Sequence, residues 1–275
     1  MLKQKLLFSV LMSTLLMLAI QPSFAIQPSF AFTLSGDASQ KGLAIATESD
    51  ARDQDWHDSQ VSMTMTLRNK KGDESQRKLR LKSLEVKGDG DKGLTIFDSP
   101  KDVKGTGFMN YSHIDKPDDQ WLFLPALKRI KRISSKNKSG PFMGSEFSFE
   151  DLSSFELEKY EYTYLGEDRV NELDSYSIEM KPVYKHSGYS KIIVWLDKGE
   201  FRLQKLEYYD RKQSLLKTQT LGEYKLYLGK YWRSHSNMME NHQTHKTTLL
   251  EFKDYQFKTG LTKSQFSKNA LKRIR

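Results

Sequence analysis

The sequence contains no cysteine among its 275 residues. A chain without cysteine cannot form a disulfide, so an exported protein of this kind must rely on its packed core for stability. It also cannot carry the lipid that bacterial lipoproteins receive on an N-terminal cysteine. We therefore expect the mature protein to be soluble and without a lipid anchor.

Motifs that would mark an active site are also missing. The chain has no G-x-S-x-G element, no Walker or Rossmann glycine loop and no H-E-x-x-H zinc motif. The pattern S-x-x-K occurs at Ser75, Ser135 and Ser214, but without the S-D-N element of penicillin-binding enzymes. His242 and His245 are three residues apart in a strand-like segment, where they would point to opposite faces. We expect no enzyme and no bound metal or other cofactor.

Long apolar runs are confined to the N-terminus. Two lysines precede an apolar run over residues 6–20, and small-residue boxes ending at Ala25 and Ala31 follow. This order is typical of a cleaved secretory signal peptide, and the run is shorter than the roughly 20 residues of a membrane span. Because the box is duplicated, cleavage after either alanine is open. The prediction is a signal peptide over residues 1–25 and a single domain over residues 32–275.

The charge balance is basic, with 44 Lys and Arg residues against 35 Asp and Glu residues and a net charge of +9. Removal of the signal peptide takes away two lysines and no acid, which leaves a net charge of about +7. Six of the cations lie between Lys128 and Lys138. In an exported protein such a run indicates an anionic membrane surface or an acidic protein face rather than nucleic acid. An edge strand protected by its lysines accounts for the run equally well.

Alternation of polar and apolar residues indicates strands. Val61 to Arg68 is apolar at every odd position, as expected of a half-buried strand. A hairpin turn at 69–72 leads to a second strand over 76–86, whose apolar phase shifts between Leu81 and Leu84 as at a bulge. The further predicted strands are 94–97, 107–112, 121–124, 160–165, 175–181, 189–196, 201–210, 215–228, 231–240 and 247–257.

Helices are predicted near the ends, over 35–53 with Ser35 or Asp37 as the cap, and within 262–275, and a further helix within 139–155 is left open. About eleven strands joined by short turns, without alternating helices, predict an antiparallel sandwich or barrel.

Two stretches in the middle of the chain resemble a known protein family. Residues 121–133 read WLFLPALKRIKRI, and residues 142–152 read FMGSEFSFEDL. Together they resemble the LolA-like family of outer-membrane lipoprotein-sorting proteins, in the branch often found beside exporters of the RND superfamily. The hairpin containing Trp195 and residues 206–210 is similar to that family as well. The resemblance implies a mostly β fold, an incomplete, half-open antiparallel barrel whose concave face holds acyl chains under a helical lid.

The resemblance and the residue pattern together assign roles to three groups of residues. The apolar cavity is expected to be lined by Met63, Met65, Leu67, Trp121, Phe123 and Trp195, although plain core packing would also account for the two methionines. The lid is expected at Phe142, Met143, Phe147 and Phe149, with Gly140, Pro141 and Gly144 as bending points. The basic docking strand is expected at Lys128, Arg129, Lys131 and Arg132.

The implied function is that of a soluble periplasmic carrier. It would move lipid-bearing or hydrophobic cargo, either lipoprotein acyl chains or an exported lipid, between inner-membrane machinery and the outer membrane. The implied partners are an RND-type exporter or a lipoprotein-release transporter, with transient contact to an anionic membrane and none to nucleic acid. Two alternatives remain open: an RseB-like envelope-stress sensor, whose relatives add a C-terminal domain, and an accessory subunit of an RND-type pump without cargo.

Overall fold

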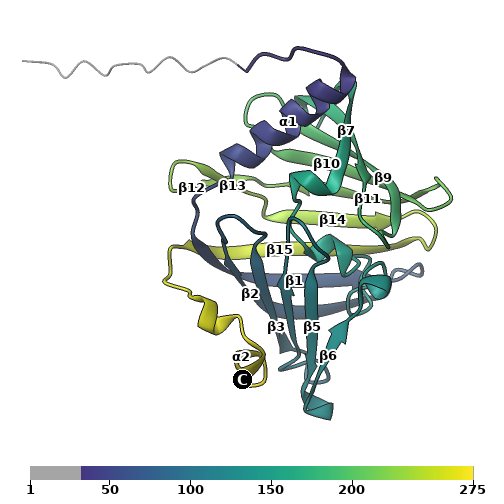
Figure 1. Cartoon of the computed structure of the whole chain (residues 1–275). Coiled ribbons are helices and arrows are strands. Elements are labelled where there is room, and N and C mark those ends of the chain that lie inside the picture. The colour runs from purple at the N-terminus through teal and green to yellow at the C-terminus, as the bar shows by residue number, and fades with distance from the viewer. Residues whose placement is uncertain (1–31, 275) are drawn as a thin grey trace, which may run out of the picture. The chain divides into compact units, whose positions relative to one another are not determined.

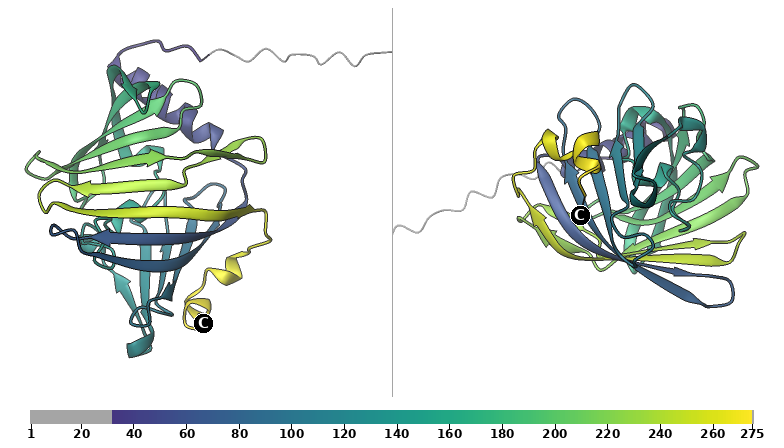
Figure 2. Two further views of the ribbon diagram at one scale, coloured as in Figure 1. Left: turned by 180° about the vertical axis from the view of Figure 1, so that it is seen from behind. Right: turned by 90° about the horizontal axis from the view of Figure 1, so that it is seen from below.

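One antiparallel sheet of 13 strands forms the body of the protein (Figure 1). The structure is a computed structural model that describes residues 32–274, so the predicted signal peptide lies outside the described residues. From one edge to the other, the strands are β6 (Arg129–Ile133), β5 (Asp119–Leu124), β4 (Gly107–Tyr111), β3 (Lys92–Ser99), β2 (Glu74–Leu84), β1 (Asp58–Arg68), β15 (Lys246–Phe257), β14 (Ser236–Asn241), β11 (Leu215–Gly222), β10 (Leu203–Asp210), β9 (Tyr189–Asp197), β8 (Leu173–Pro182) and β7 (Tyr160–Val170). The sheet is strongly curved but not closed, because β6 and β7 remain its two edges (Figure 2). The predicted unclosed, mostly β architecture is confirmed.

Most predicted strands appear with their boundaries shifted by a few residues. The predicted strands 215–228 and 231–240 are each divided in two, which gives the small separate hairpin β12 (Lys225–Tyr227) and β13 (Tyr231–Arg233). The first division falls at Glu223, whose φ of 54° is incompatible with a continuous strand. The bulge expected between Leu81 and Leu84 is not there, since β1 and β2 pair without a register shift. The irregularity of β2 lies instead between Lys78 and Leu79, opposite β3.

The strand registers define one continuous face across the whole sheet. Met63 on β1 lies opposite Phe252 on β15, and the same face continues through successive pairs to Val194 and Ile178 at the other end. Side chains of β7 to β10 line a cavity on this face together with the loop between β2 and β3, so we call it the concave face. The opposite side is the outer face. Alternation along each strand places neighbouring residues on different faces.

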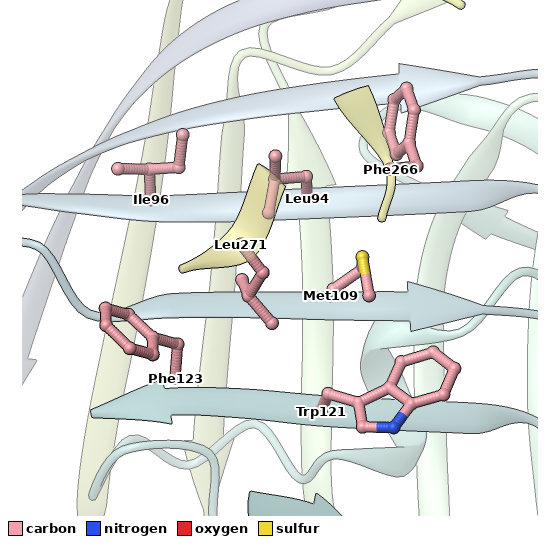
Figure 3. Close-up of a cluster of buried hydrophobic side chains, with 7 residues drawn as sticks. All are labelled: Leu94, Ile96, Met109, Trp121, Phe123, Phe266 and Leu271. Atoms are coloured by element: carbon pink, nitrogen blue, oxygen red, sulfur yellow. The ribbon is translucent and has the colours of Figure 1, made fainter. Parts of the chain in front are cut away.

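The outer face of β3, β4 and β5 is covered by the C-terminal tail, in which a short helix was predicted. The tail contains η5 (Lys263–Gln265) and α2 (Lys268–Leu271), and its side chains Phe266 and Leu271 are almost fully buried. Gly107 makes the close approach possible, because a Cβ at that position would lie 2.7 Å from a methyl carbon of Leu271. Figure 3 shows the resulting cluster, which comprises Leu94, Ile96, Met109, Trp121, Phe123, Phe266 and Leu271.

The predicted N-terminal helix is α1 (Ala38–Arg52), and Asp37 is its cap. The Asp37 carboxylate accepts a hydrogen bond from the Gln40 amide, and the Gln40 side chain accepts one from the Asp37 amide. These reciprocal bonds satisfy two of the donors left free at a helix start. α1 lies across the β7 end of the sheet (Figure 1), where Gly42 packs so closely that a Cβ would lie 2.9 Å from the Thr163 amide nitrogen. α1 therefore forms a fixed wall over this end of the concave face.

Candidate functional site

A cavity of about 410 Å³ lies on the concave face under α1. Its walls are α1, the loop 85–91 between β2 and β3, and the turn 154–158, which leads into η4 (Leu157–Lys159). Its floor is formed by β8, β9 and β10. The volume falls within the range of about 300–1,000 Å³ that small-molecule sites occupy.

The floor of the cavity is apolar. Alternate residues of neighbouring strands meet there in register, with Ile178 opposite Val194 and Val194 opposite Leu206. The side chains that cover the floor and the adjacent wall are Ile178, Met180, Val194, Leu196, Leu206 and Trp56. Such a surface can bind a hydrocarbon chain but provides no group for covalent chemistry.

The rim of the cavity is acidic. Asp50 comes from α1, Asp53 from its C-cap, Asp91 from the loop 85–91, and Glu156 from the turn 154–158. Burial, together with the nearby carboxylates of Glu156 and Glu85, raises the pKa of Asp91 from 3.8 to about 7, although a hydrogen bond from the Val86 amide acts in the opposite direction. Burial also raises the pKa of Asp50, Asp53 and Glu156. The rim is therefore a partly desolvated group of carboxylates, several of which repel one another.

Residues 138–153, here called the cover segment, fill the concave face beside the cavity. Phe142 is 1% exposed and packs against Phe97, Phe108 and Phe149 with ring centroids 5.2–5.8 Å apart. The amide of Glu146 donates to the Thr248 hydroxyl at 3.0 Å. The cover segment is therefore packed onto the strands beneath it.

Buried ion pairs hold the cover segment in place. Lys138 Nζ lies 2.6 Å from one carboxylate oxygen of Asp118, and Lys159 Nζ lies 2.5 Å from the other. Asp151 pairs with Lys217 at 2.5 Å, and both side chains are at most 3% exposed. Burial would raise the pKa of Asp118, but the two ammonium groups outweigh burial and lower it. These cations and carboxylates satisfy one another inside the protein.

Glu150 anchors the C-terminal part of the cover segment to the loop before β9. Its carboxylate accepts hydrogen bonds from the Tyr184 hydroxyl at 2.5 Å, the Ser187 hydroxyl at 2.5 Å and the Gly188 amide at 2.8 Å. Three donors converging on one buried carboxylate define a single position for this part of the segment.

Comparison with known proteins places this architecture in a family. A crystal structure of a domain from Vibrio parahaemolyticus, named as an outer membrane lipoprotein-sorting protein, is 58% identical in sequence, with a TM-score of 0.84. The match covers 86% of this chain and all of that one. The chain belongs to the LolA-like family of outer-membrane lipoprotein-sorting proteins.

Other relatives of this LolA-like protein agree. A DUF1329 family protein from Desulfovibrio piger is 27% identical with a TM-score of 0.82, and a LolA superfamily protein from Nitrosomonas europaea is 19% identical with a TM-score of 0.67. Each match covers 86% of this chain and all of the other. A family model described only as an uncharacterized protein family matches residues 89–273. None of the curated proteins compared with the chain matches it.

The six predicted cavity residues of the LolA-like protein do not line the cavity. Met63 and Met65 are buried on the concave face near the cover segment, and Leu67 lies further along β1 and is partly exposed. Trp121 and Phe123 lie on the outer face under the C-terminal tail (Figure 3). Trp195 also faces outward, because it lies opposite Ser177 and its indole nitrogen donates to Asp168. The cavity is formed instead by the neighbouring positions of β8 to β10.

The four predicted lid residues do come together in the cover segment. Phe142 and Phe147 are buried, and Phe149 and Met143 are partly buried. Met143 and Gly144 both have positive φ values, of 51° and 80°, and form the turn of the segment. The segment covers the concave face, but Phe142 and Phe147 are packed as core residues.

The four predicted docking residues lie at one edge of the sheet. Lys128 follows η1 (Pro125–Leu127), and Arg129, Lys131 and Arg132 are exposed on the edge strand β6. Arg132 also pairs with Asp119 at 2.5 Å. The adjacent Leu127 is 63% exposed, so an apolar side chain accompanies the cations.

The acidic rim was not predicted from the sequence. The segment Gly88-Asp89-Gly90-Asp91 reads only as a turn, and Asp50 and Asp53 read as the polar side of a helix. Asp50 and the C-cap residue Asp53 are three residues apart, which places both on one side of the helix. Part of the rim could have been predicted from this spacing. Within residues 32–274 no group of His, Asp and Glu is arranged to hold a metal ion. No helix in that part of the chain is long and apolar enough to cross a membrane.

Proposed function

We propose that this LolA-like protein is a periplasmic carrier that holds a hydrocarbon chain of lipid-bearing or hydrophobic cargo in the cavity under α1. It would move this cargo between inner-membrane machinery and the outer membrane. The observation that carries the proposal is the 410 Å³ cavity with its apolar floor. The role needs no catalytic group, and we propose binding rather than catalysis.

The energetics of an acyl chain in water support a carrier. Burying one methylene is worth about 0.8 kcal/mol, so exposing a chain of about fifteen carbons costs on the order of 10 kcal/mol. Free diffusion across an aqueous compartment is therefore prohibitive. The open sheet provides an apolar surface without requiring the protein to unfold, and α1 with the rim shields that surface from water.

Export and docking complete the proposal. The apolar N-terminal run and its small-residue boxes support a signal peptide cleaved after residue 25 or 31, followed by one domain over 32–275. The exposed cations of β6, together with Leu127, would contact an anionic membrane or an inner-membrane transporter during loading or delivery.

The cavity can be tested with two adjacent residues of β9 on opposite faces. Val194 lies on the floor of the cavity, whereas Ile193 is partly exposed on the outer face. We expect lipid extracted from protein purified from the periplasm to be detectable by mass spectrometry. Val194→Phe should lower its amount and weaken binding of a neutral fluorescent acylglycerol by about tenfold, because the larger side chain occupies the cavity. Ile193→Phe should change neither.

Two outcomes would contradict the proposal. The first is the absence of both extractable lipid and binding of the neutral acylglycerol in the unaltered protein. The second is equal binding by both variants, provided that circular dichroism and thermal melting show that each is folded.

A further inference from the structure

The rim of the cavity carries negative charge that the protein does not neutralise. Seven acidic side chains and one basic side chain, Lys87, line the cavity. Asp53 pairs with Arg233 at 2.6 Å, Asp89 pairs with His113 at 2.7 Å, and Lys87 pairs with Asp55 at 3.1 Å. The other five acids form no ion pair within residues 32–274, and they are Asp50, Glu85, Asp91, Glu156 and Glu158.

These carboxylates converge from three separate segments. Asp50 belongs to α1, Glu85 and Asp91 to the loop 85–91, and Glu156 to the turn 154–158. The loop and the turn meet at Gly90, where a Cβ would lie 2.6 Å from a carboxylate oxygen of Glu156. The rim therefore results from the fold and from a close backbone approach, since no local run of sequence brings these groups together.

The electrostatics of the rim show that its carboxylates are incompletely compensated. Burial raises the pKa of Asp91, and Glu156 and Glu85 contribute in the same direction. Burial likewise raises the pKa of Glu156, and this rise exceeds the lowering by a hydrogen bond from the Ser154 hydroxyl and by the charge of Lys159. A cation placed among these groups would favour their ionised forms and relieve their repulsion.

The buried ion pairs beside the cavity provide a comparison within the same molecule. There the carboxylates of Asp118 and Asp151 are matched by Lys138, Lys159 and Lys217 at 2.5–2.6 Å. The chain has a net charge of +9, yet five of the seven acids that line the cavity form no ion pair within residues 32–274. The protein thus pairs the buried carboxylates that hold the cover segment, but leaves most of those around the apolar cavity unpaired.

We propose that the cavity is selective for amphiphiles with a cationic head group, whose chain lies on the floor of β8 to β10 and whose charge lies among the rim carboxylates. This inference rests on the proposed function and adds the chemical class of the cargo. The apolar floor and the acidic rim are separate observations, and together they match the two ends of such a molecule. An anionic head group would meet uncompensated like charges and would be rejected.

The test uses three amphiphiles with chains of equal length: dodecyltrimethylammonium, the neutral monolauroylglycerol, and laurate. Each would displace a neutral fluorescent probe from the protein below its micellar concentration, at about pH 8 so that the carboxylates are ionised. We expect dodecyltrimethylammonium to bind about tenfold or more tightly than laurate, with monolauroylglycerol between them.

The rim variant Asp50→Asn, Asp91→Asn, Glu156→Gln removes three charges and keeps an acceptor oxygen at each position. In this variant the affinity ratio between the cationic and the anionic amphiphile should fall to about twofold or less. The matched control Glu161→Gln, Glu167→Gln, Asp174→Asn removes three exposed charges outside the cavity and should keep the ratio. Thermal melting would verify that both variants are folded.

The outcomes separate the two proposals. If all three amphiphiles bind with similar affinity, or if laurate binds best, the head-group inference is wrong while the carrier proposal stands. A ratio that falls equally in the control variant would also overturn the inference, because the effect would then come from net charge. If none of the three displaces the probe, the carrier proposal itself fails, and the inference fails with it.

Discussion

At the scale of single residues, Asp118 shows how a buried charge stabilises the cover segment. Its side chain is 2% exposed and bridges Lys138 and Lys159. Asp118→Asn would leave two ammonium groups buried without a counter-charge, so we expect a loss of about 3–5 kcal/mol in the free energy of unfolding. The neighbouring Asp119→Asn removes a partly exposed pair with Arg132 and a longer contact with His113, and it should cost at most about 1 kcal/mol.

Urea unfolding of both variants would test this difference. Because the pKa of Asp118 is lowered in the folded protein, its contribution is present above pH values of about 4 and is lost as the pH falls through the folded pKa. Equal losses in the two variants would mean that the ion pairs around Asp118 do not stabilise the cover segment.

Asp91 is the opposite case, because its pKa is raised from 3.8 to about 7. Between these two pH values the folded protein retains a proton that the unfolded chain has lost, so stability decreases as the pH rises. Asp91→Asn removes this penalty. We expect the variant to be more stable than the unaltered protein by about 1–2 kcal/mol at pH values above 7, less than the full shift implies because Asp91 is partly exposed.

The gain should disappear near pH 4, where Asp91 is protonated in the folded protein. Urea unfolding across the pH range would measure it. Asp102→Asn, an exposed change outside the cavity, is the control and should show no such trend. A gain for Asp91→Asn that does not depend on pH would exclude the rim's charge as its cause.

At the scale of elements, the cover segment is both packed into the core and laid over the concave face of the sheet. Phe142 is in contact with three aromatic rings and almost fully buried, whereas its neighbour Met143 is partly exposed with a φ of 51°. We expect Phe142→Ala to lower the free energy of unfolding by about 3–5 kcal/mol and Met143→Ala to change it by less than about 1 kcal/mol. Urea unfolding would measure both.

A small effect of Phe142→Ala would mean that the segment is loosely held and could open as a lid. The large effect that we expect would instead mean that cargo enters and leaves under α1 while the cover segment stays in place. The ion pairs at Asp118 and Asp151 favour the second outcome, because opening would separate buried charges.

At the scale of the whole molecule, the exposed cations of β6 allow a test of the proposed contact with an anionic membrane. Arg129 and Lys131 are exposed on the edge strand β6 next to Leu127. Each cation near an anionic surface is worth about 1 kcal/mol, so Arg129→Gln, Lys131→Gln should weaken binding to anionic vesicles by about tenfold or more. High salt should weaken it as well.

The control is Lys70→Gln, Lys71→Gln, which removes the same charge from the exposed β1–β2 turn. Co-sedimentation with vesicles of phosphatidylcholine and phosphatidylglycerol would compare the two variants. Equal weakening would show that the net charge of the protein, rather than β6, governs the contact.

The sequence by itself determined the fold class and the family. Alternation over Val61 to Arg68 and the later strands indicates an antiparallel β protein, because half-buried strands must alternate. The motif over 121–152 points to the LolA-like family. These signals are local, and residues close in sequence are sufficient to carry them.

Only the tertiary structure decided where the cavity lies. Alternation shows which residues share a face, as Trp121 and Phe123 do, but not whether that face is concave or covered by the C-terminal tail. The floor at Val194 and the rim at Asp50 and Asp91 are distant in sequence and meet only because the sheet curves under α1. The charge and the shape of the site both result from this assembly of separate segments. Neither could be predicted from one short stretch of sequence.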